Sequence, residues 1–234
     1  MTENQGTQHP LTLITNDIIR IFSGMGFEVA IGPEMEDEWY NFDALNVPKD
    51  HPARDMQDTF WIKGHPGKVL RTHTSPVQVR YIEQLIKDNK KPPFAIIVPG
   101  KVFRNEATDA THEMQFHQVE GLVVGENISL ANLKGVLLEF FKHFVGEETE
   151  IRLRPSFFPF VEPGVEVDVK MKDRWVEVLG AGVVHPDVLR NAGLDPAHYS
   201  GIAFGMGVER LAMLKYGVTD IRLFYQGDLR LNQF

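Results

Sequence analysis

One short segment, Phe116 to Leu122, alternates residues that could bind a ligand with apolar residues. Successive side chains of a β-strand point to opposite faces, so Phe116, Gln118 and Glu120 would share one face. A carboxamide and a carboxylate in an otherwise apolar strand face either solvent or a polar cleft. In a cleft they suit a cation such as an ammonium group, because both supply acceptor oxygens. The segment therefore predicts either an exposed sheet face or a site for an amine.

A second polar group precedes this strand. Arg104 and Glu106 have the two-residue spacing that places both on one strand face, and the polar loop Thr108 to His112 leads from them to Phe116. Alone, such a pair is typical of a surface ion pair, which contributes little stability. Because a guanidinium suits phosphate and an aromatic ring suits a base, a hairpin that displays these residues together favours nucleotide binding as the functional interpretation.

An aromatic run, Phe157-Phe158-Pro159-Phe160, follows later in the chain. Phenylalanines usually pack in a core, but a proline does not fit a central strand. Phe158 and Phe160 face alike and could form a slot for a ligand ring. Glu162 comes next and is a candidate magnesium ligand if a phosphate lies nearby. Two further carboxylates are expected on a solvated strand face: Glu166 and Asp168.

The segment Ala203 to Arg210 contains a Gly-x-Gly pattern and is expected to open the last helix. No third glycine stands at dinucleotide spacing and no βαβ unit surrounds it, so the pattern excludes a Rossmann site. Arg210 would lie in the first turn, where the helix dipole does not favour a cation. That position indicates an anionic partner.

These residues need a scaffold, and the hydrophobic periodicity predicts an α+β fold, an antiparallel sheet flanked by helices. Helices are expected over Leu11–Gly24, from Thr74-Ser75-Pro76 to about Asn89, over Leu130–Phe144, and from about Met206 to Tyr216. Extended segments are expected at 27–31, 94–98, 101–106, 116–124, 150–154, 165–171 and 175–179. With no linker in the chain, we expect a flexible tail over residues 1–9 and one domain over residues 10–234.

Composition restricts the function classes. The 24 basic and 32 acidic residues give a net charge of −8, so the chain lacks the basic surplus of a self-sufficient nucleic-acid binder. With no cysteine, disulfides, thiolate zinc sites and cysteine nucleophiles are excluded. No Gly-x-Ser-x-Gly elbow supports a hydrolase triad, and no histidine pair has metal-helix spacing. No apolar run is long enough to span a membrane and the start carries no signal peptide, so we expect a cytoplasmic protein.

Taken together, the segments resemble the catalytic α subunits of bacterial phenylalanyl-tRNA synthetases, which are class II aminoacyl-tRNA synthetases. The resemblance covers residues 10–234, and the order and spacing of its stretches are more specific than any one of them. These stretches are Asn41–Phe60, Arg71–Gln78, Phe103–Gly121, Arg154–Pro163 and Tyr199–Leu211. The family fold is an antiparallel sheet flanked by helices, in agreement with the periodicity.

The resemblance implies an ATP site. Arg104 would clamp the α-phosphate, Glu106 would read the adenine amino group, and His112 would meet the outer phosphates. Phe116 would stack on adenine. Arg210, in the motif 3 helix, would hold the γ-phosphate.

It also implies an amino-acid site. Four polar residues would hold the ammonium and carboxylate ends: His73, Ser75, Gln118 and Glu120. Phe158 and Phe160 would flank the ring, Ala203 would form the pocket floor and limit para substituents, and Gly205 would line the wall. For Mg²⁺, which would accompany ATP, the resemblance implies Glu162 as a ligand and Glu177, on the strand before motif 3, as a second ligand in the ATP site.

The implied function is activation of phenylalanine by ATP to phenylalanyl-adenylate, with release of pyrophosphate, followed by transfer to the 3′ end of tRNA(Phe). Family α subunits carry a long helical arm and work with a β subunit, whereas only about nine polar residues precede the core here. We therefore expect a catalytic core that charges tRNA weakly without further domains and associates with a β subunit or a second copy. The alternative is a synthetase-like paralogue that binds phenylalanine or ATP without turnover, or serves in assembly.

Overall fold

The computed structural model describes residues 6–55, 58–172 and 174–233, and is built on a seven-stranded sheet. Within the predicted tail, residues 1–5 lie outside the described residues, while His9 caps the first helix by accepting from the backbone N–H of Leu11. The strand order is β1-β4-β5-β9-β8-β7-β6. The strands are β1 (Glu28–Val29), β4 (Phe94–Phe103), β5 (Gln115–Gly125), β6 (Ile151–Phe158), β7 (Val161–Met171), β8 (Arg174–Val184) and β9 (Ser200–Gly207).

The sheet is antiparallel except at one edge, where β1 pairs in parallel with β4, with Glu28 opposite Ile96. A wholly antiparallel sheet was predicted, so this pair is a correction. The parallel pair requires a long crossover, which residues 30–93 supply. That crossover contains a two-stranded sheet, β2 (Met35–Asp37) with β3 (Lys68–Leu70), and the helices α2 (Glu38–Asn41) and α3 (Pro76–Lys87).

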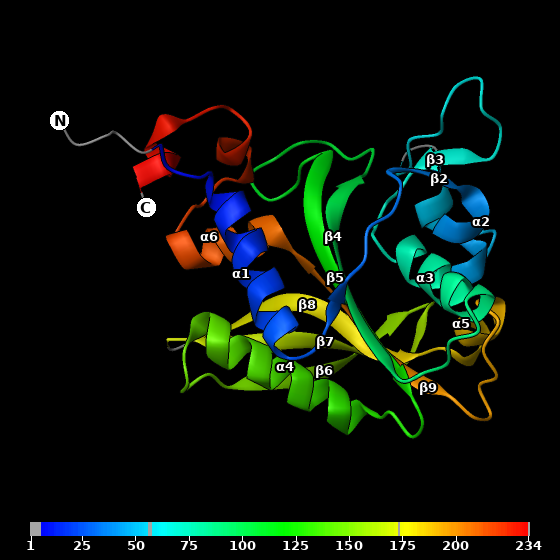
Figure 1. Ribbon diagram of the computed structural model, residues 1–234. Coiled ribbons are helices and arrows are strands. Elements are labelled where there is room, and N and C mark those ends of the chain that lie inside the picture. The colour runs from blue at the N-terminus through cyan, green and yellow to red at the C-terminus, as the bar shows by residue number, and fades with distance from the viewer. Residues whose placement is uncertain (1–5, 56–57, 173, 234) are drawn as a thin grey trace.

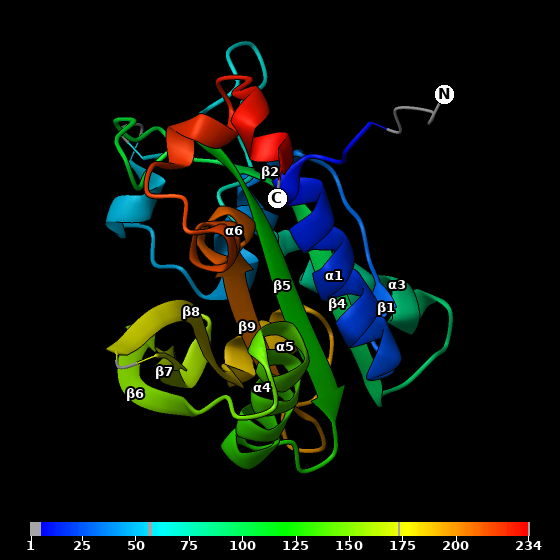
Figure 2. The same ribbon diagram turned by 90° about the vertical axis from the view of Figure 1, so that its left-hand side faces the viewer.

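Helices cover the two faces of the sheet unequally. On one face α1 (Pro10–Gly24) packs against α4 (Leu130–Val145) and α6 (Val208–Tyr216), around a core that contains Phe22 and Phe140 (Figures 1 and 2). The opposite face carries α2, α3 and α5 (Pro186–Asn191), with Leu122 and Val124 in the second core. Short 3₁₀ turns complete the chain: η1 (Asp43–Leu45), η2 (Pro52–Arg54), η3 (Ile221–Phe224) and η4 (Leu229–Gln233).

Alternation along β5 explains where the site lies. Leu122 and Val124 are buried under α3 and α5, and Glu120, Gln118 and Phe116 continue the same face toward the edge of this cover. Most of the predicted elements are present within a few residues of their expected bounds. Among the described residues, no helix is long and apolar enough to cross a membrane.

Two boundaries differ from prediction at the functional residues. The segment Ala203 to Arg210 was expected to open the last helix, but its first five residues belong to strand β9 and α6 begins at Val208. The backbone of β9 pairs with both β5 and β8, and this strand pairing outweighs the helical pattern. Strand β4 ends at Phe103, so Arg104 and Glu106 lie in the β4–β5 hairpin loop rather than on a strand.

Candidate functional site

A cavity of about 290 Å³ opens on the face of the sheet that carries α2, α3 and α5. We call it the inner cavity. It lies between β5, β8, β9, the residues before α3 and the β6–β7 turn. All eight residues that the resemblance assigned to the amino acid line it: His73, Ser75, Gln118, Glu120, Phe158, Phe160, Ala203 and Gly205. Four separate chain segments thus bring the predicted residues together.

Glu120 forms the polar end of the inner cavity. Its carboxylate accepts from the backbone N–H of Thr74 (3.0 Å), from Nε2 of Gln78 (3.0 Å) and from the hydroxyl of Ser75. Ser75 was expected to start α3, and its hydroxyl is directed to Glu120 instead of capping the helix. Burial raises the pKa of Glu120, and these hydrogen bonds oppose that shift.

His73, which lines the same cavity, is held neutral. Burial, together with the charges of Arg104 and Arg71, lowers its pKa to about 3. The Nδ1 atom of His73 and the Oε1 atom of Gln118 are buried without a hydrogen-bond partner in residues 6–55, 58–172 and 174–233. Buried polar atoms are normally paired, so two orphaned atoms in one cavity wall indicate a polar ligand.

The other end of the inner cavity is apolar. The rings of Phe158 and Phe160 lie roughly parallel, with centroids 6.0 Å apart and an interplanar angle of 21°. Ala203 and Val184 close the remaining side. A ligand with an aromatic ring at one end and charged groups at the other matches this division.

A second cavity of about 180 Å³, the outer cavity, adjoins the first at Arg104, which lines both. Its wall includes the other residues predicted for ATP, except Glu177: Glu106, His112, Phe116 and Arg210. The hairpin loop therefore places Arg104 and Glu106 together although neither is on a strand.

Arg104 is oriented by three contacts. Its guanidinium carbon lies 5.0 Å from the centre of the Phe116 ring, its Nε donates to the carbonyl of Thr72 (3.3 Å), and Nη1 lies 3.8 Å from Oε1 of Glu106. Desolvation lowers the pKa of Arg104, but a guanidinium stays protonated at neutral pH. A charged group at the junction of two cavities can bind an anion that spans both.

Arg210 lies in the first turn of α6, as predicted. Its Nε and Nη2 lie 3.4 and 3.5 Å from the carbonyl oxygen of Glu177. His112 is exposed in the hairpin loop, where its Nδ1 lies 3.0 Å from Oδ2 of Asp109. Arg210 on α6 and His112 in the hairpin loop thus both line the outer cavity.

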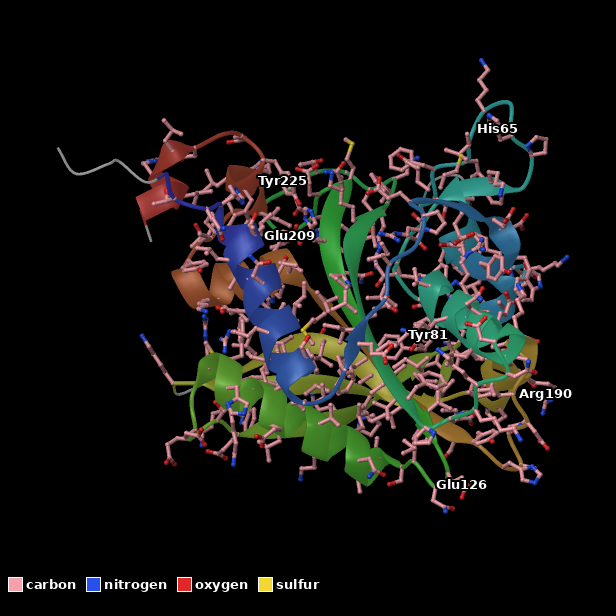
Figure 3. All side chains as sticks on the ribbon, in the orientation of Figure 1. His65, Tyr81, Glu126, Arg190, Glu209 and Tyr225 are labelled. Carbon is pink, nitrogen blue, oxygen red and sulfur yellow. The ribbon has the colours of Figure 1, made fainter. Side chains whose placement is uncertain are left out.

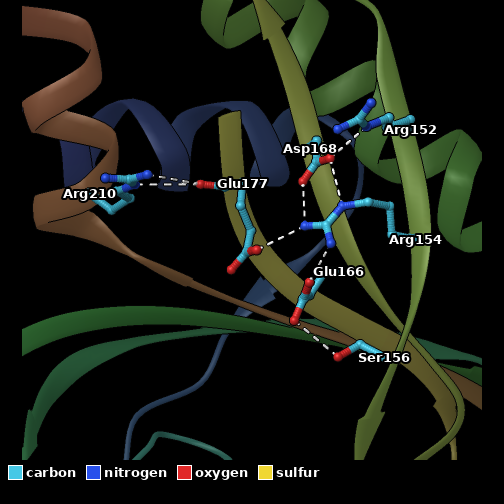
Figure 4. A network of polar contacts seen from close by, with 7 residues as sticks. All are labelled: Arg152, Arg154, Ser156, Glu166, Asp168, Glu177 and Arg210. Carbon is cyan, nitrogen blue, oxygen red and sulfur yellow. Dashed lines mark hydrogen bonds and ion pairs between the residues drawn. The ribbon is translucent and has the colours of Figure 1, made fainter. Parts of the chain in front are cut away.

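The two carboxylates assigned to magnesium lie in different places, and neither lines either cavity. Glu162 is 77 % exposed at the start of β7, with Oε2 3.5 Å from Nε2 of His185. Glu177 is next to Arg210, but its carboxylate pairs with Arg154 at 2.9 Å (Figure 4). No group of three potential metal ligands is found in the part of the chain that the structure describes.

A β-bulge in β8 gives Glu177 its position. Gly180 lies opposite Glu166 and Glu177 lies opposite Asp168, with the register shift between Val167 and Asp168. Residues three apart on a regular strand face opposite ways, so the extra residue turns Glu177 to the face that carries Gly180. Asp168 is 3 % exposed and binds Arg152 and Arg154, and these arginines lower its pKa. Its predicted solvated position was wrong.

Sequence reasoning missed several residues of the site. Gly180, Gln78 and Val184 line the inner cavity, and Glu209 lines the outer one. The Leu-Gly-Ala-Gly run at 179–182 was the available signal for Gly180, whose missing side chain leaves room for the Phe158 ring. Nothing in the sequence distinguished Gln78 from other polar residues of α3.

The arrangement as a whole suits a two-substrate reaction. The lining of the inner cavity suits an amino acid with an aromatic ring, the cationic and aromatic side chains of the outer cavity suit a nucleotide, and Arg104 lies between the two. Such a site works by positioning and by stabilising charge.

Comparison with known proteins shows the family of the chain. A family model described as "tRNA synthetases class II core domain (F)" matches residues 1–234. The chain is 54 % identical to the phenylalanine–tRNA ligase alpha subunit of Dehalococcoides mccartyi, covering 98 % of this chain and 70 % of that protein. The corresponding values for the alpha subunit of Aliivibrio fischeri are 56 %, 99 % and 69 %. Among solved structures, the pyrrolysyl-tRNA synthetase of Desulfitobacterium hafniense matches with a TM-score of 0.74 at 18 % identity, over 97 % of this chain and 76 % of that one.

Proposed function

Because the chain belongs to the class II tRNA synthetase core family, and within it to the phenylalanine–tRNA ligase alpha subunits, we propose that its two adjoining cavities hold phenylalanine and ATP for the ligase reaction. The single observation that carries this assignment is that Arg104 lines both cavities. The enzyme is a ligase: it joins phenylalanine to tRNA through phenylalanyl-adenylate.

In the inner cavity, the benzyl ring of phenylalanine packs against the rings of Phe158 and Phe160, whose centroids at 6.0 Å lie too close together to enclose a third ring. Its ammonium group binds Glu120 and Oε1 of Gln118, which is an acceptor without a partner in the described residues. Neutral His73 offers a nitrogen to the carboxylate end without adding a competing positive charge. Burying a ring while pairing both charged ends favours phenylalanine over amino acids that lack a ring.

In the outer cavity, adenine stacks on Phe116 and its amino group faces Glu106. Arg210 and His112 bind the outer phosphates. This places the α-phosphate at Arg104, where the carboxylate of phenylalanine attacks phosphorus and pyrophosphate leaves. Arg104 stabilises the negative charge that develops on the α-phosphate oxygens, so little acid–base chemistry is needed.

Magnesium fits this site as a companion of ATP rather than in a preformed cage. Mg²⁺ is usually held by one or two carboxylates plus substrate phosphates, and Glu177, 56 % exposed beside Arg210, can supply one carboxylate. Glu177 must then exchange its ion pair with Arg154 for the metal ion. Glu162, beside His185, would have to act from outside the outer cavity. When bound, the ion would neutralise phosphate charge.

We also propose that the enzyme works with further protein. The relatives are named alpha subunits, which favours a β subunit, and a second copy of this chain is the alternative. The net charge of −8 favours weak binding of the tRNA(Phe) 3′ end by this chain alone.

ATP–pyrophosphate exchange tests the proposal. The purified chain, alone and with its β subunit, should exchange pyrophosphate into ATP with phenylalanine, far less with tyrosine, and not without amino acid. Binding of phenylalanine and ATP without exchange in either preparation would instead support a binding protein. Exchange that depends equally on unrelated amino acids would contradict the assignment of the inner cavity.

A further inference from the structure

Glu209 is a buried carboxylate in the wall of the outer cavity to which the proposed reaction gives no role. Its side chain is 2 % exposed, although it lies in the first turn of α6 directly before Arg210. A buried charge is costly unless hydrogen bonds satisfy it, so its partners indicate what it does.

The first partner is the backbone of β5. The β5–β9 ladder ends where Gln118 lies opposite Gly207, because the chain then turns into α6. His117 precedes Gln118 on β5, and its N–H therefore has no carbonyl of β9 to bind. It donates to both carboxylate oxygens of Glu209, at 2.9 and 3.0 Å. Glu209 thus replaces the missing strand and fixes how α6 leaves the sheet.

The other two partners are side chains. The Nδ1 atom of His117 lies 2.8 Å from Oε1 of Glu209, and the hydroxyl of Tyr225 donates to the same oxygen at 2.5 Å. Figure 3 shows Glu209 and Tyr225 close together at the start of α6. Burial and the charge of Glu209 raise the pKa of Tyr225, so its hydroxyl stays a donor.

These bonds join three elements that wall the outer cavity. Phe116 precedes His117 on β5, Arg210 follows Glu209 on α6, and Ile221 begins the short helix η3 that leads to Tyr225. One carboxylate therefore sets the separation between the proposed adenine platform and the proposed phosphate cation. Its oxygens are occupied by donors, and a carboxylate repels phosphate, so it is not suited to contact ATP directly.

We propose that Glu209 is a positioning residue for ATP, which acts by holding Arg210 and Phe116 at the spacing a bound triphosphate requires. The inference rests on the proposed function of the outer cavity. It assigns Glu209 no contact with phenylalanine, whose cavity Glu209 does not line.

The test is the steady-state kinetics of pyrophosphate exchange for Glu209→Gln. A carboxamide can accept from the His117 N–H but presents an NH₂ group to the remaining donors, so the tie weakens without a change of shape. We expect the KM for ATP to rise about tenfold or more, which corresponds to the loss of one hydrogen bond to a charged group. The KM for phenylalanine should stay within about twofold of wild type. Tyr225→Phe, which keeps the contacts of the His117 N–H and Nδ1 with Glu209, should show the same split with a smaller increase.

Glu36→Gln is the matched control. Glu36 is also a fully buried carboxylate, bonded to Arg80, but lines neither cavity. Replacing this carboxylate should lower the melting temperature and leave the KM values for ATP and phenylalanine unchanged. If Glu209→Gln lowers only the melting temperature, or raises both KM values alike, Glu209 is merely structural and the proposal is wrong. If the wild-type chain itself shows no exchange, the proposed function fails, and ATP affinity measured by calorimetry on the same variants still decides the role of Glu209.

Discussion

Replacing Gly180 with alanine should impair phenylalanine binding selectively. Gly180 lies on β8 beneath the Phe158 ring, and a Cβ built there would lie 2.8 Å from Cζ and 3.2 and 3.3 Å from the two Cε atoms of that ring. Ordinary contact begins near 3.4 Å, so the ring must move by at least the difference, 3.4 − 2.8 = 0.6 Å. The displaced ring moves away from the sheet and into the inner cavity, so it narrows the space left for the ring of phenylalanine.

The size of the effect follows from overpacking. Inserting one methyl group into a packed site costs about 1–3 kcal/mol. If most of that cost falls on the bound state, the KM for phenylalanine in pyrophosphate exchange rises roughly 5- to 100-fold. The KM for ATP should be unchanged, since Gly180 does not line the outer cavity.

Gly135→Ala provides the control for glycine replacement. Gly135 lies within α4, where a Cβ would meet nothing within 4 Å, so this variant should be more stable by about 0.5–1 kcal/mol and kinetically normal. An unchanged KM for phenylalanine in a folded Gly180→Ala protein would refute the assignment of the inner cavity. Equal increases in both KM values would show that the two cavities are not separate sites.

Two further predictions concern the same cavity. Ala203→Gly removes a methyl group from its wall and should admit para-substituted phenylalanines, which exchange assays with para-chlorophenylalanine would detect; unchanged selectivity would mean that Ala203 is not the floor. His73 has a pKa of about 3 when folded and about 6.5 when unfolded, so acid protonates the unfolded state first and stability falls as the pH drops below 6.5. Between pH 7 and pH 5 the wild type should lose about 2 kcal/mol more unfolding free energy than His73→Gln in urea titrations, and equal losses would show that His73 is not buried neutral.

Side-chain alternation carried much of the site prediction. Because period two is a local property of a strand, Phe116, Gln118 and Glu120 could be placed on one face from the sequence alone, and all three line the cavities. The resemblance then supplied residues from distant segments, such as His73 and Phe158, which no local pattern connects. Their proximity is confirmed, whereas their individual roles remain predictions.

What could not be predicted depends on tertiary pairing. The bulge at Val178, which turns Glu177 toward the face of Gly180, arises from the register between β7 and β8 and leaves no local pattern. The glycine-rich segment before Arg210 was assigned to a helix because its strand partners, β5 and β8, are distant in sequence. Asp168 was expected in solvent because its ion pairs with Arg152 and Arg154 cross from β6.

Glu209 illustrates the same limit at the level of one residue. An acidic residue in the first turn of a helix is commonplace, since it suits the helix dipole. Only the end of the β5–β9 ladder, which leaves the His117 N–H without a strand partner, shows why a carboxylate is needed there.

The most direct test of the central claim, that phenylalanine and ATP meet at Arg104, is phenylalanine-dependent pyrophosphate exchange in Arg104→Ala. The matched control is Arg20→Ala, whose side chain is 71 % exposed on α1. Removing the guanidinium at the junction should lower the exchange rate by on the order of 10²-fold or more, while Arg20→Ala exchanges like the wild type. Near-normal exchange in a folded Arg104→Ala protein would contradict the account.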